Sequence, residues 1–254
     1  MIIDAHGHVG TWGDFFVPQP SADWLVATAT RIGIDAVGVS HLVAIGYDTR
    51  LGNRMALDLA RRHRGRLGVW LVADPHDRDG HSVVAEQLDE PGVWGLKLHP
   101  DVHECSVLDS RYTPYLRLAT ERGVPVLCHG QTRSDHSDPG DLAEAVRRHP
   151  GLRLLAGHAG LWPDGFTRAA ELAAAHDGLH LEICGSRLTA RWLEHLVAVA
   201  GADKVLFGTD ACFLDPRVGL GKVVHARLSP ADRDLVLGGN AARLLGSRAR
   251  HDGG

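Results

Sequence analysis

Short apolar runs recur at fairly regular intervals along the chain, and most are bounded by glycine, proline or aspartate. The eight runs occupy residues 1–8, 36–40, 67–73, 93–99, 124–129, 152–158, 179–184 and 204–210. Apolar runs of this length are typical of strands that are buried on both faces of a parallel sheet. The pattern therefore predicts eight buried strands.

Between these runs, apolar residues recur at the spacing of amphipathic helices. We expect helices near 21–26, 51–63, 82–88, 112–122, 141–149, 165–176 and 188–200, and a last helical region from 229 to 245. Several of these segments end at glycine, a common C-cap, and Pro230 favours a helix start. Eight strand–helix units predict an α/β fold, a single-domain (β/α)8 TIM barrel over residues 1–246, with 247–254 as a flexible tail.

A doubly wound open sheet is the structural alternative. It would need a glycine-rich phosphate loop after an early strand, and no segment matches G-x-G-x-x-G. The barrel is therefore the better interpretation.

The first run ends in Asp4-Ala5-His6-Gly7-His8. Because side chains alternate along a strand, Asp4, His6 and His8 share one face. Imidazoles are common ligands for zinc and similar metals. With 17 histidines in 254 residues, a single His-x-His pair is weak evidence, so the interpretation depends on further ligands at the same place.

Further ionisable residues stand at the ends of the other predicted strands. They are Lys97, His99, His129, His158, Glu182 and Asp210. The carboxyl ends of the strands form the catalytic face of a TIM barrel, so these side chains are expected to meet. The coincidence of position predicts a metal-dependent enzyme.

The order of these motifs resembles the metal-dependent amidohydrolase superfamily, in its amidohydrolase-related branch of hydrolases and nonoxidative decarboxylases. The resemblance spans nearly the whole chain, and its landmarks are residues 4–8, 95–100, 124–129, 156–160, 207–210 and 239–241. It implies that His6, His8, His129 and Asp210 hold a first metal ion. It also implies that His158 either binds a second ion or acts near the nucleophilic water, and that Lys97 is a bridging, often carbamylated, lysine.

A metal with this ligand set activates water at neutral pH, and Asp210 and His158 are the candidate catalytic residues. The leading hypothesis is a hydrolase of an amide, lactone or ester bond in a small organic substrate. The alternative is a metal-dependent nonoxidative decarboxylase of a small carboxylic acid, and a third is an inactive barrel that only binds a ligand. Zinc is the first choice of metal, with manganese, iron and cobalt also suitable, in one or two ions.

Each residue has a structural alternative. His6 and His8 can form a buried hydrogen-bonded pair, and Asp210 can cap a helix. Lys97 can instead pair with Asp4 or Glu182 inside the barrel. We expect Asp4 and Glu182 to support a histidine or Lys97 without binding the metal.

Four further residues are candidates for substrate binding. Arg133, in the loop after the fifth strand, is either a carboxylate clamp or a solvated arginine. His99 and His41 close strands and can line the pocket. Trp12, with the neighbouring Phe15, can form a pocket wall or pack elsewhere.

Composition and charge narrow the partners to small molecules. The formal net charge is −4 without a basic block, which disfavours nucleic acid. No apolar run reaches the roughly 18 residues of a membrane span, and the N-terminus lacks signal-peptide features. The four separated cysteines are typical of free thiols, so we expect a cytoplasmic protein. A homodimer is left open.

Overall fold

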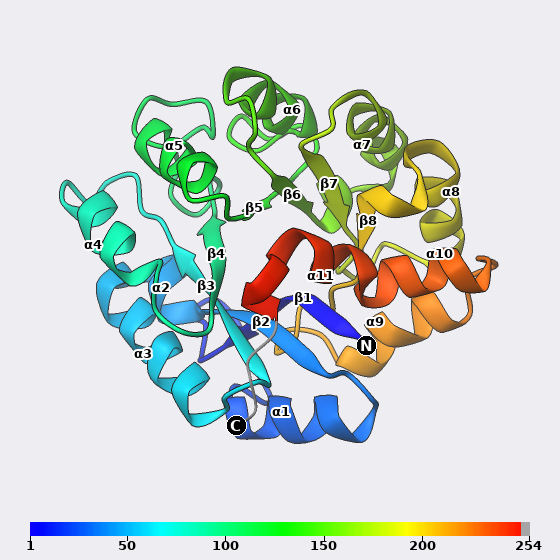
Figure 1. The fold of residues 1–254 in the computed structure, drawn as a ribbon, viewed down its shortest axis with the longest axis horizontal. Helices are drawn as coiled ribbons and strands as arrows, with labels where there is room; N and C mark the ends of the chain where they lie inside the picture. The colour runs from blue at the N-terminus through cyan, green and yellow to red at the C-terminus, as the bar shows by residue number, and fades with distance from the viewer. Residues whose placement is uncertain (250–254) are drawn as a thin grey trace.

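The computed structural model describes residues 1–249 and forms one eight-stranded parallel sheet. In chain order the strands are β1 (Ile3–Val9), β2 (Ala36–His41), β3 (Leu67–Val72), β4 (Val93–Leu98), β5 (Val126–His129), β6 (Leu154–Gly157), β7 (Leu179–Glu182) and β8 (Val205–Leu206). Each strand pairs with the next along the chain. Helices surround the sheet (Figure 1). The predicted (β/α)8 TIM barrel is confirmed.

The barrel is nearly closed where β1 meets the segment that begins with β8. The amide of Ala5 donates to the carbonyl of Phe207 at 2.9 Å, and the amide of Asp210 donates to the carbonyl of His6 at 2.8 Å. A further parallel bridge joins Gly7 to Ala211. These bonds hold the two ends of the sheet together and place Asp210 beside the histidines of β1.

The helices mostly follow the predicted segments. They are α1 (Ala22–Arg31), α2 (Leu42–Gly46), α3 (Thr49–Arg62), α4 (Gly80–Gln87), α5 (Thr113–Glu121), α6 (Pro139–Arg148), α7 (Pro163–Ala175), α8 (Ala190–Ala200), α9 (Pro216–Val224), α10 (Pro230–Asp234) and α11 (Asn240–Leu245). The prediction missed α2 and α9. α2 is a single short turn directly after β2, and α9 contains two glycines that weaken the helical pattern.

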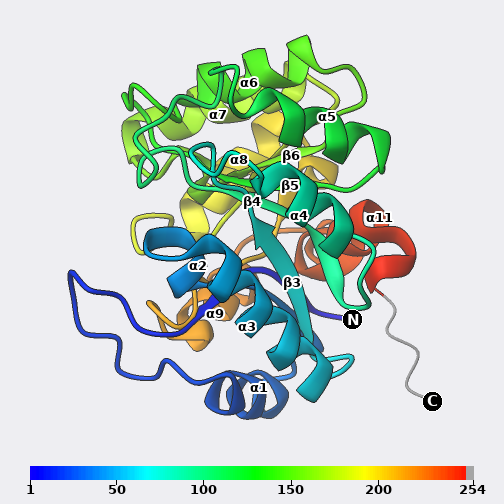
Figure 2. The ribbon, with the colours of Figure 1, turned by 90° about the vertical axis from the view of Figure 1, so that its left-hand side faces the viewer.

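The core has two layers of contact. One apolar cluster packs the helices against the outside of the sheet. A second cluster fills the barrel at the amino ends of the strands, where Trp70 and Trp94 meet α11. Figure 1 shows α11 lying across this end, and Figure 2 shows the β1–α1 loop extending from the opposite side. One end of the barrel is therefore filled by apolar side chains.

The C-terminal segment differs in part from the expected tail. Gly246–Ala249 forms a short 3₁₀ turn, and the Arg248 guanidinium donates to the carbonyls of Leu88 and Val93. These bonds order residues 247–249 because they satisfy carbonyls near the start of β4. Residues 250–254 lie outside the described part of the chain.

Two further expectations can be compared with the structure. All four cysteines are free and buried. Among residues 1–249, no helix has both the length and the apolar character that a membrane span requires.

Candidate metal centre

Three side chains converge where β1 and the segment after β8 meet. His6, His8 and Asp210 each offer one ligand atom, and these atoms lie within 4.8 Å of one another. The Nε2 atom of His8 is 3.3 Å from Oδ1 of Asp210. The two histidines come from one face of β1 because they are two residues apart. The sequence therefore positions two candidate ligands locally, and barrel closure adds the third.

His6 is held through both ring nitrogens and is fully buried. Its Nδ1 lies 2.6 Å from Oε2 of Glu182, and its Nε2 lies 3.0 Å from Nζ of Lys97. A carboxylate accepts the Nδ1 proton, which leaves the Nε2 lone pair free to bind a cation. Gly208 makes this contact possible, since a Cβ there would lie 2.0 Å from Glu182.

His8 is oriented by a residue that sequence reasoning did not assign. The Oγ of Ser40, on β2, lies 3.0 Å from His8 Nδ1, which leaves Nε2 facing Asp210. The ring of Phe213 lies against the ring of His8 with centroids 5.2 Å apart. Ser40 lies directly opposite His8 in the parallel register of β1 and β2, and local sequence pattern does not reveal that register.

Three more histidines form a row next to this group. His158 follows β6, and its Nε2 lies 3.2 Å from Nδ1 of His129. The ring of His99 stacks on His129 with centroids 4.2 Å apart and an interplanar angle of 11°. The Nε2 of His129 is 3.9 Å from Asp101. His129 thus contacts His158. It lies outside the cluster of His6, His8 and Asp210.

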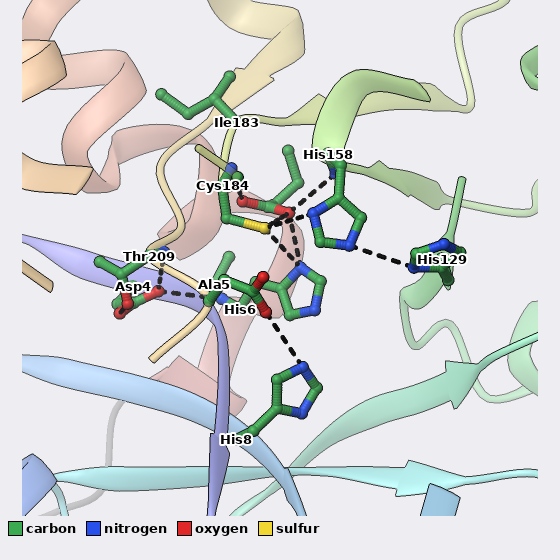
Figure 3. Close-up of polar contacts among 12 residues, drawn as sticks. Asp4, Ala5, His6, His8, His129, His158, Ile183, Cys184 and Thr209 are labelled. Carbon is green, nitrogen blue, oxygen red and sulfur yellow. Dashed lines mark hydrogen bonds and ion pairs between the residues drawn. The ribbon is translucent and has the colours of Figure 1, made fainter. Parts of the chain in front are cut away.

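Cys184, two residues beyond the end of β7, is a site residue that the sequence analysis missed. Its Sγ lies 3.0 Å from Nδ1 of His158, 3.2 Å from Nδ1 of His6 and 3.0 Å from Oε2 of Glu182 (Figure 3). A single cysteine after an apolar strand has the pattern of an ordinary core residue. Only its position at a strand end indicated a functional role.

Burial keeps three histidines of the site, His6, His129 and His158, in the neutral form. It lowers the pKa of His158 to about 4 and lowers the pKa of His6 and His129 well below the ordinary value. Burial raises the pKa of Asp210, but the hydrogen bond with His8 and the nearby His158 and His6 outweigh it, so that pKa is lowered overall. Neutral imidazoles and an ionised carboxylate are the forms that bind metals.

Two of these residues have unusual backbone conformations. His158 has φ of 60° and Asp210 has φ of 61°, in the left-handed region that few non-glycine residues adopt. Such conformations cost energy and concentrate at functional sites. Their occurrence at two residues of one cluster supports a functional origin.

Lys97 and Asp4 have different partners from those expected. Lys97 is fully buried beside His6, and within residues 1–249 no ion pair joins it to Asp4 or Glu182. Asp4 accepts hydrogen bonds from the amide and hydroxyl of Thr209 and from the amide of His6. Its role is therefore to tie β1 to the segment after β8, and it supports neither Lys97 nor an imidazole ring directly. Glu182 does orient a histidine, as its contact with His6 shows.

The predicted substrate-binding residues are dispersed. Arg133 is 79% exposed and pairs with Asp164, so its guanidinium lies outside the cluster. His41 caps α2 and lines a cavity of about 330 Å³ between the β1–α1 loop and α3. Trp12 packs edge-on against Tyr47 and Phe213, whereas His99 stacks on His129. Trp12 is therefore separated from His8 by Phe213, and His99 is separated from the cluster by His129.

The residues fit a divalent ion. A tetrahedral site with bonds near 2.0–2.2 Å has ligand atoms about 3.3–3.5 Å apart, and His8 and Asp210 are separated by 3.3 Å. The set of two imidazoles and one carboxylate suits zinc, manganese, iron or cobalt. The cation would bind on the Nε2 side of His6, where Lys97 now lies.

A barrel with histidine and carboxylate side chains gathered at the carboxyl ends of its eight strands has the arrangement of metal-dependent TIM-barrel enzymes. The family model described as Amidohydrolase matches residues 3–247, so the chain belongs to this family. The resemblance inferred from the motifs is confirmed. Comparison with curated proteins gives no match.

Solved structures support the fold. A TIM-barrel protein from Bordetella bronchiseptica has a TM-score of 0.79 at 17% identity, covering 98% of this chain and 99% of its own. A dihydroxybenzoic acid decarboxylase from Polaromonas sp. JS666, with bound manganese and 2-nitroresorcinol, has a TM-score of 0.77 at 15% identity and covers 97% of both chains. The 5-carboxyvanillate decarboxylase of Sphingomonas paucimobilis has a TM-score of 0.75 at 13% identity, covering 96% and 98%.

Proposed function

We propose that this protein is a divalent-metal-dependent hydrolase that uses water to cleave an amide, lactone or ester bond of a small organic substrate. The observation that carries the proposal is the convergence of His6, His8 and Asp210 at the open end of the barrel. Membership of the Amidohydrolase family supports it.

In this proposal His6, His8 and Asp210 hold the ion, and His129 joins them by turning away from His158. Zinc is the first candidate, and manganese, iron and cobalt also suit these ligands. A bound ion would lower the pKa of water from 15.7 to about 7 and polarise a substrate carbonyl. Lys97 stays a candidate bridging ligand after carbamylation, because its amine already faces His6.

The remaining steps belong to side chains of this chain. Asp210 is ionised and accepts a proton from the attacking water. His158 is neutral, and a proton on its Nε2 can stabilise the oxyanion that develops on the carbonyl. Glu182 fixes the orientation and tautomer of His6 through the 2.6 Å hydrogen bond.

A metal-dependent decarboxylase is the second candidate. Its specific support is that structures with TM-scores of 0.75 and 0.77 are decarboxylases, one of them with bound manganese. The exposed position of Arg133 weakens the idea that this residue clamps a substrate carboxylate. A barrel that only binds a ligand is disfavoured because the proposed donors are present and converge.

Metal analysis of the purified protein tests the proposal, followed by assays with aryl esters, lactones, amides and hydroxybenzoates. Hydrolysis predicts incorporation of ¹⁸O from labelled water, whereas decarboxylation predicts CO₂ release. Asp210→Asn should lower metal content and activity by at least about tenfold, and Asp215→Asn, at the cap of α9, should change neither. Full activity of the metal-free protein, or of Asp210→Asn, would refute the metal mechanism.

We also propose that the protein acts in the cytoplasm. Four free, buried thiols suit a reducing compartment, where disulfides are rare. Fractionation of cells that express the natural protein is the measurement.

A further inference from the structure

A cavity of about 330 Å³ lies outside the barrel, between the base of the β1–α1 loop, the start of α1 and one face of α3. Figures 1 and 2 both show α1 and α3 next to each other on one side of the barrel. The volume falls within the range of about 300–1,000 Å³ that is usual for small-molecule sites. The proposed metal chemistry makes no use of this cavity.

The cavity and the metal centre lie on opposite faces of β1 and β2. His8 and Ser40 are opposite each other in the sheet, and both point into the barrel, where their side chains are 3.0 Å apart. The next pair along these strands is Val9 and His41. Because side chains alternate along a strand, this pair points outwards, and both residues line the cavity.

His41 brings a hydrogen-bond donor without a partner to the cavity. The residue is only 5% exposed, and its Nδ1 accepts a hydrogen bond from the amide of Val43 at 3.2 Å. Burial lowers the pKa of His41, so the ring is neutral and carries its proton on Nε2. Within residues 1–249, no hydrogen bond or ion pair reaches Nε2, and this atom is not sealed off from solvent-accessible space. A buried donor of this kind is available to a ligand in the cavity.

Other free polar groups of the cavity wall are donors as well. The Oγ of Ser21 accepts from the amide of Trp24, which leaves its hydrogen available. Ser21 is the N-cap of α1, and the first amides of a helix have no partner within the helix. Arg62 ends α3 and lines the cavity, and no carboxylate in the described part of the chain pairs with it.

Two carboxylates also line the cavity, but each already has a neighbour that can carry positive charge. Asp58 pairs with Arg61 at 2.6 Å, and Oδ1 of Asp23 lies 2.7 Å from Nε2 of His63. The side chains of Asp58 and Asp23 are 67% and 73% exposed, so solvent screens their charge. The remaining wall is mostly apolar, with Val9, Pro20, Ala22, Met55 and Leu59. Free donors beside an apolar wall favour a ligand with an acceptor group and an apolar body.

We propose that this cavity binds a small monocarboxylic acid with an apolar chain. The carboxylate accepts hydrogen bonds from Nε2 of His41 and from the amino end of α1, and Arg62 adds positive charge at the rim. The apolar chain lies against Met55 and Leu59 on α3. Binding is non-covalent. The site is independent of the proposed function, because neither His41 nor Arg62 has a part in the metal chemistry.

Isothermal titration calorimetry of the full-length protein with sodium hexanoate is the test. His41→Asn keeps an oxygen that can accept from the amide of Val43 but removes the Nε2 donor, and it should weaken binding at least about fivefold. Arg62→Gln should weaken binding at least about threefold. The matched control is Arg64→Gln, outside the cavity, which should bind hexanoate like the unmodified protein. Hexylamine has the same chain with the opposite charge and should not bind.

The outcomes also separate this site from the metal centre. Hexanoate should bind to His8→Ala as tightly as to the unmodified protein, because His8 points to the other face of β1. Loss of binding in His8→Ala with unchanged binding in His41→Asn would assign hexanoate to the metal centre and overturn the proposal. Hexylamine binding more tightly than hexanoate, or equal affinities of Arg62→Gln and Arg64→Gln, would also overturn it. So would the absence of binding to the unmodified protein at about 10 mM hexanoate, by calorimetry and by saturation-transfer NMR.

Discussion

Replacing Asp4 by Asn should make the protein less sensitive to alkaline pH. Asp4 is completely buried, and this burial raises its pKa from 3.8 to about 7, although hydrogen bonds from Thr209 and His6 act in the opposite direction. The folded state thus holds the proton more tightly than the unfolded chain does between pH 4 and 7. The contribution of Asp4 to stability is complete below pH 4 and is lost as the pH rises through about 7.

The magnitude follows from the interval between the two pKa values. At 1.36 kcal/mol per pH unit, the interval from 3.8 to about 7 corresponds to about 4 kcal/mol. Asn keeps the hydrogen-bond pattern, because its oxygen accepts from the amides of His6 and Thr209. Its amide nitrogen can then donate to the Thr209 hydroxyl, now 2.5 Å from Asp4 (Figure 3). The substitution removes the titration and little else.

The assay is urea denaturation of metal-free protein, monitored by circular dichroism at a series of pH values from 5 to 8. The free energy of unfolding of Asp4→Asn, relative to the unmodified protein, should rise by about 2 kcal/mol from pH 5 to 7 and level off above that. Asp215→Asn is the control, since Arg217 lowers the pKa of Asp215 and its titration is complete below pH 5. A difference for Asp4→Asn that stays constant or falls with pH would refute the reasoning.

Three further substitutions test other parts of the structure. Phe213→Ala should raise KM for aryl substrates about 2- to 10-fold with little change in kcat, because the Phe213 ring lies against His8. Steady-state kinetics measures this change, and Phe16→Ala, which replaces an exposed ring, is the control. Asn240→Ala should lower the free energy of unfolding by about 2–3 kcal/mol, because the buried Asn240 amide donates to the carbonyls of Ala202 and Val205 at the start of β8. Urea denaturation measures this loss, and an unchanged midpoint would contradict it. Arg133→Ala should keep kcat/KM within about twofold, because its guanidinium pairs with Asp164 at the surface; a tenfold loss would return Arg133 to the substrate site.

The sequence predicted the barrel because fully buried parallel strands leave continuous apolar runs, which local pattern reveals. The predicted ends of the strands were less accurate. The run at 204–210 contains only a two-residue β8, because Phe207 and Asp210 make backbone hydrogen bonds to β1 outside regular strand geometry. Short α2 lacks enough residues for a periodic signal.

The candidate site was predictable where position along a strand decides direction. His6 and His8 share a face by alternation, and Asp210 meets them because the barrel closes there. The direction of a loop side chain depends on partners distant in the chain, and Arg133 turned towards Asp164 on α7. Cys184 was missed for a different reason. It follows Glu182 by two residues, but its contacts with His6 on β1 and His158 on η1 (His158–Gly160) join distant segments that no local pattern relates to it.

The contact between Lys97 and His6 limits how a cation can bind at the first site. The Lys97 amine faces the Nε2 lone pair of His6 at 3.0 Å, and burial lowers the pKa of this lysine. An ammonium group and a divalent cation cannot both occupy that lone pair, because like charges at this distance repel strongly in a buried site. Cation binding on this side of His6 therefore requires Lys97 to move, to lose its proton or to become a carbamate anion. The first site is thus coupled to the charge of Lys97.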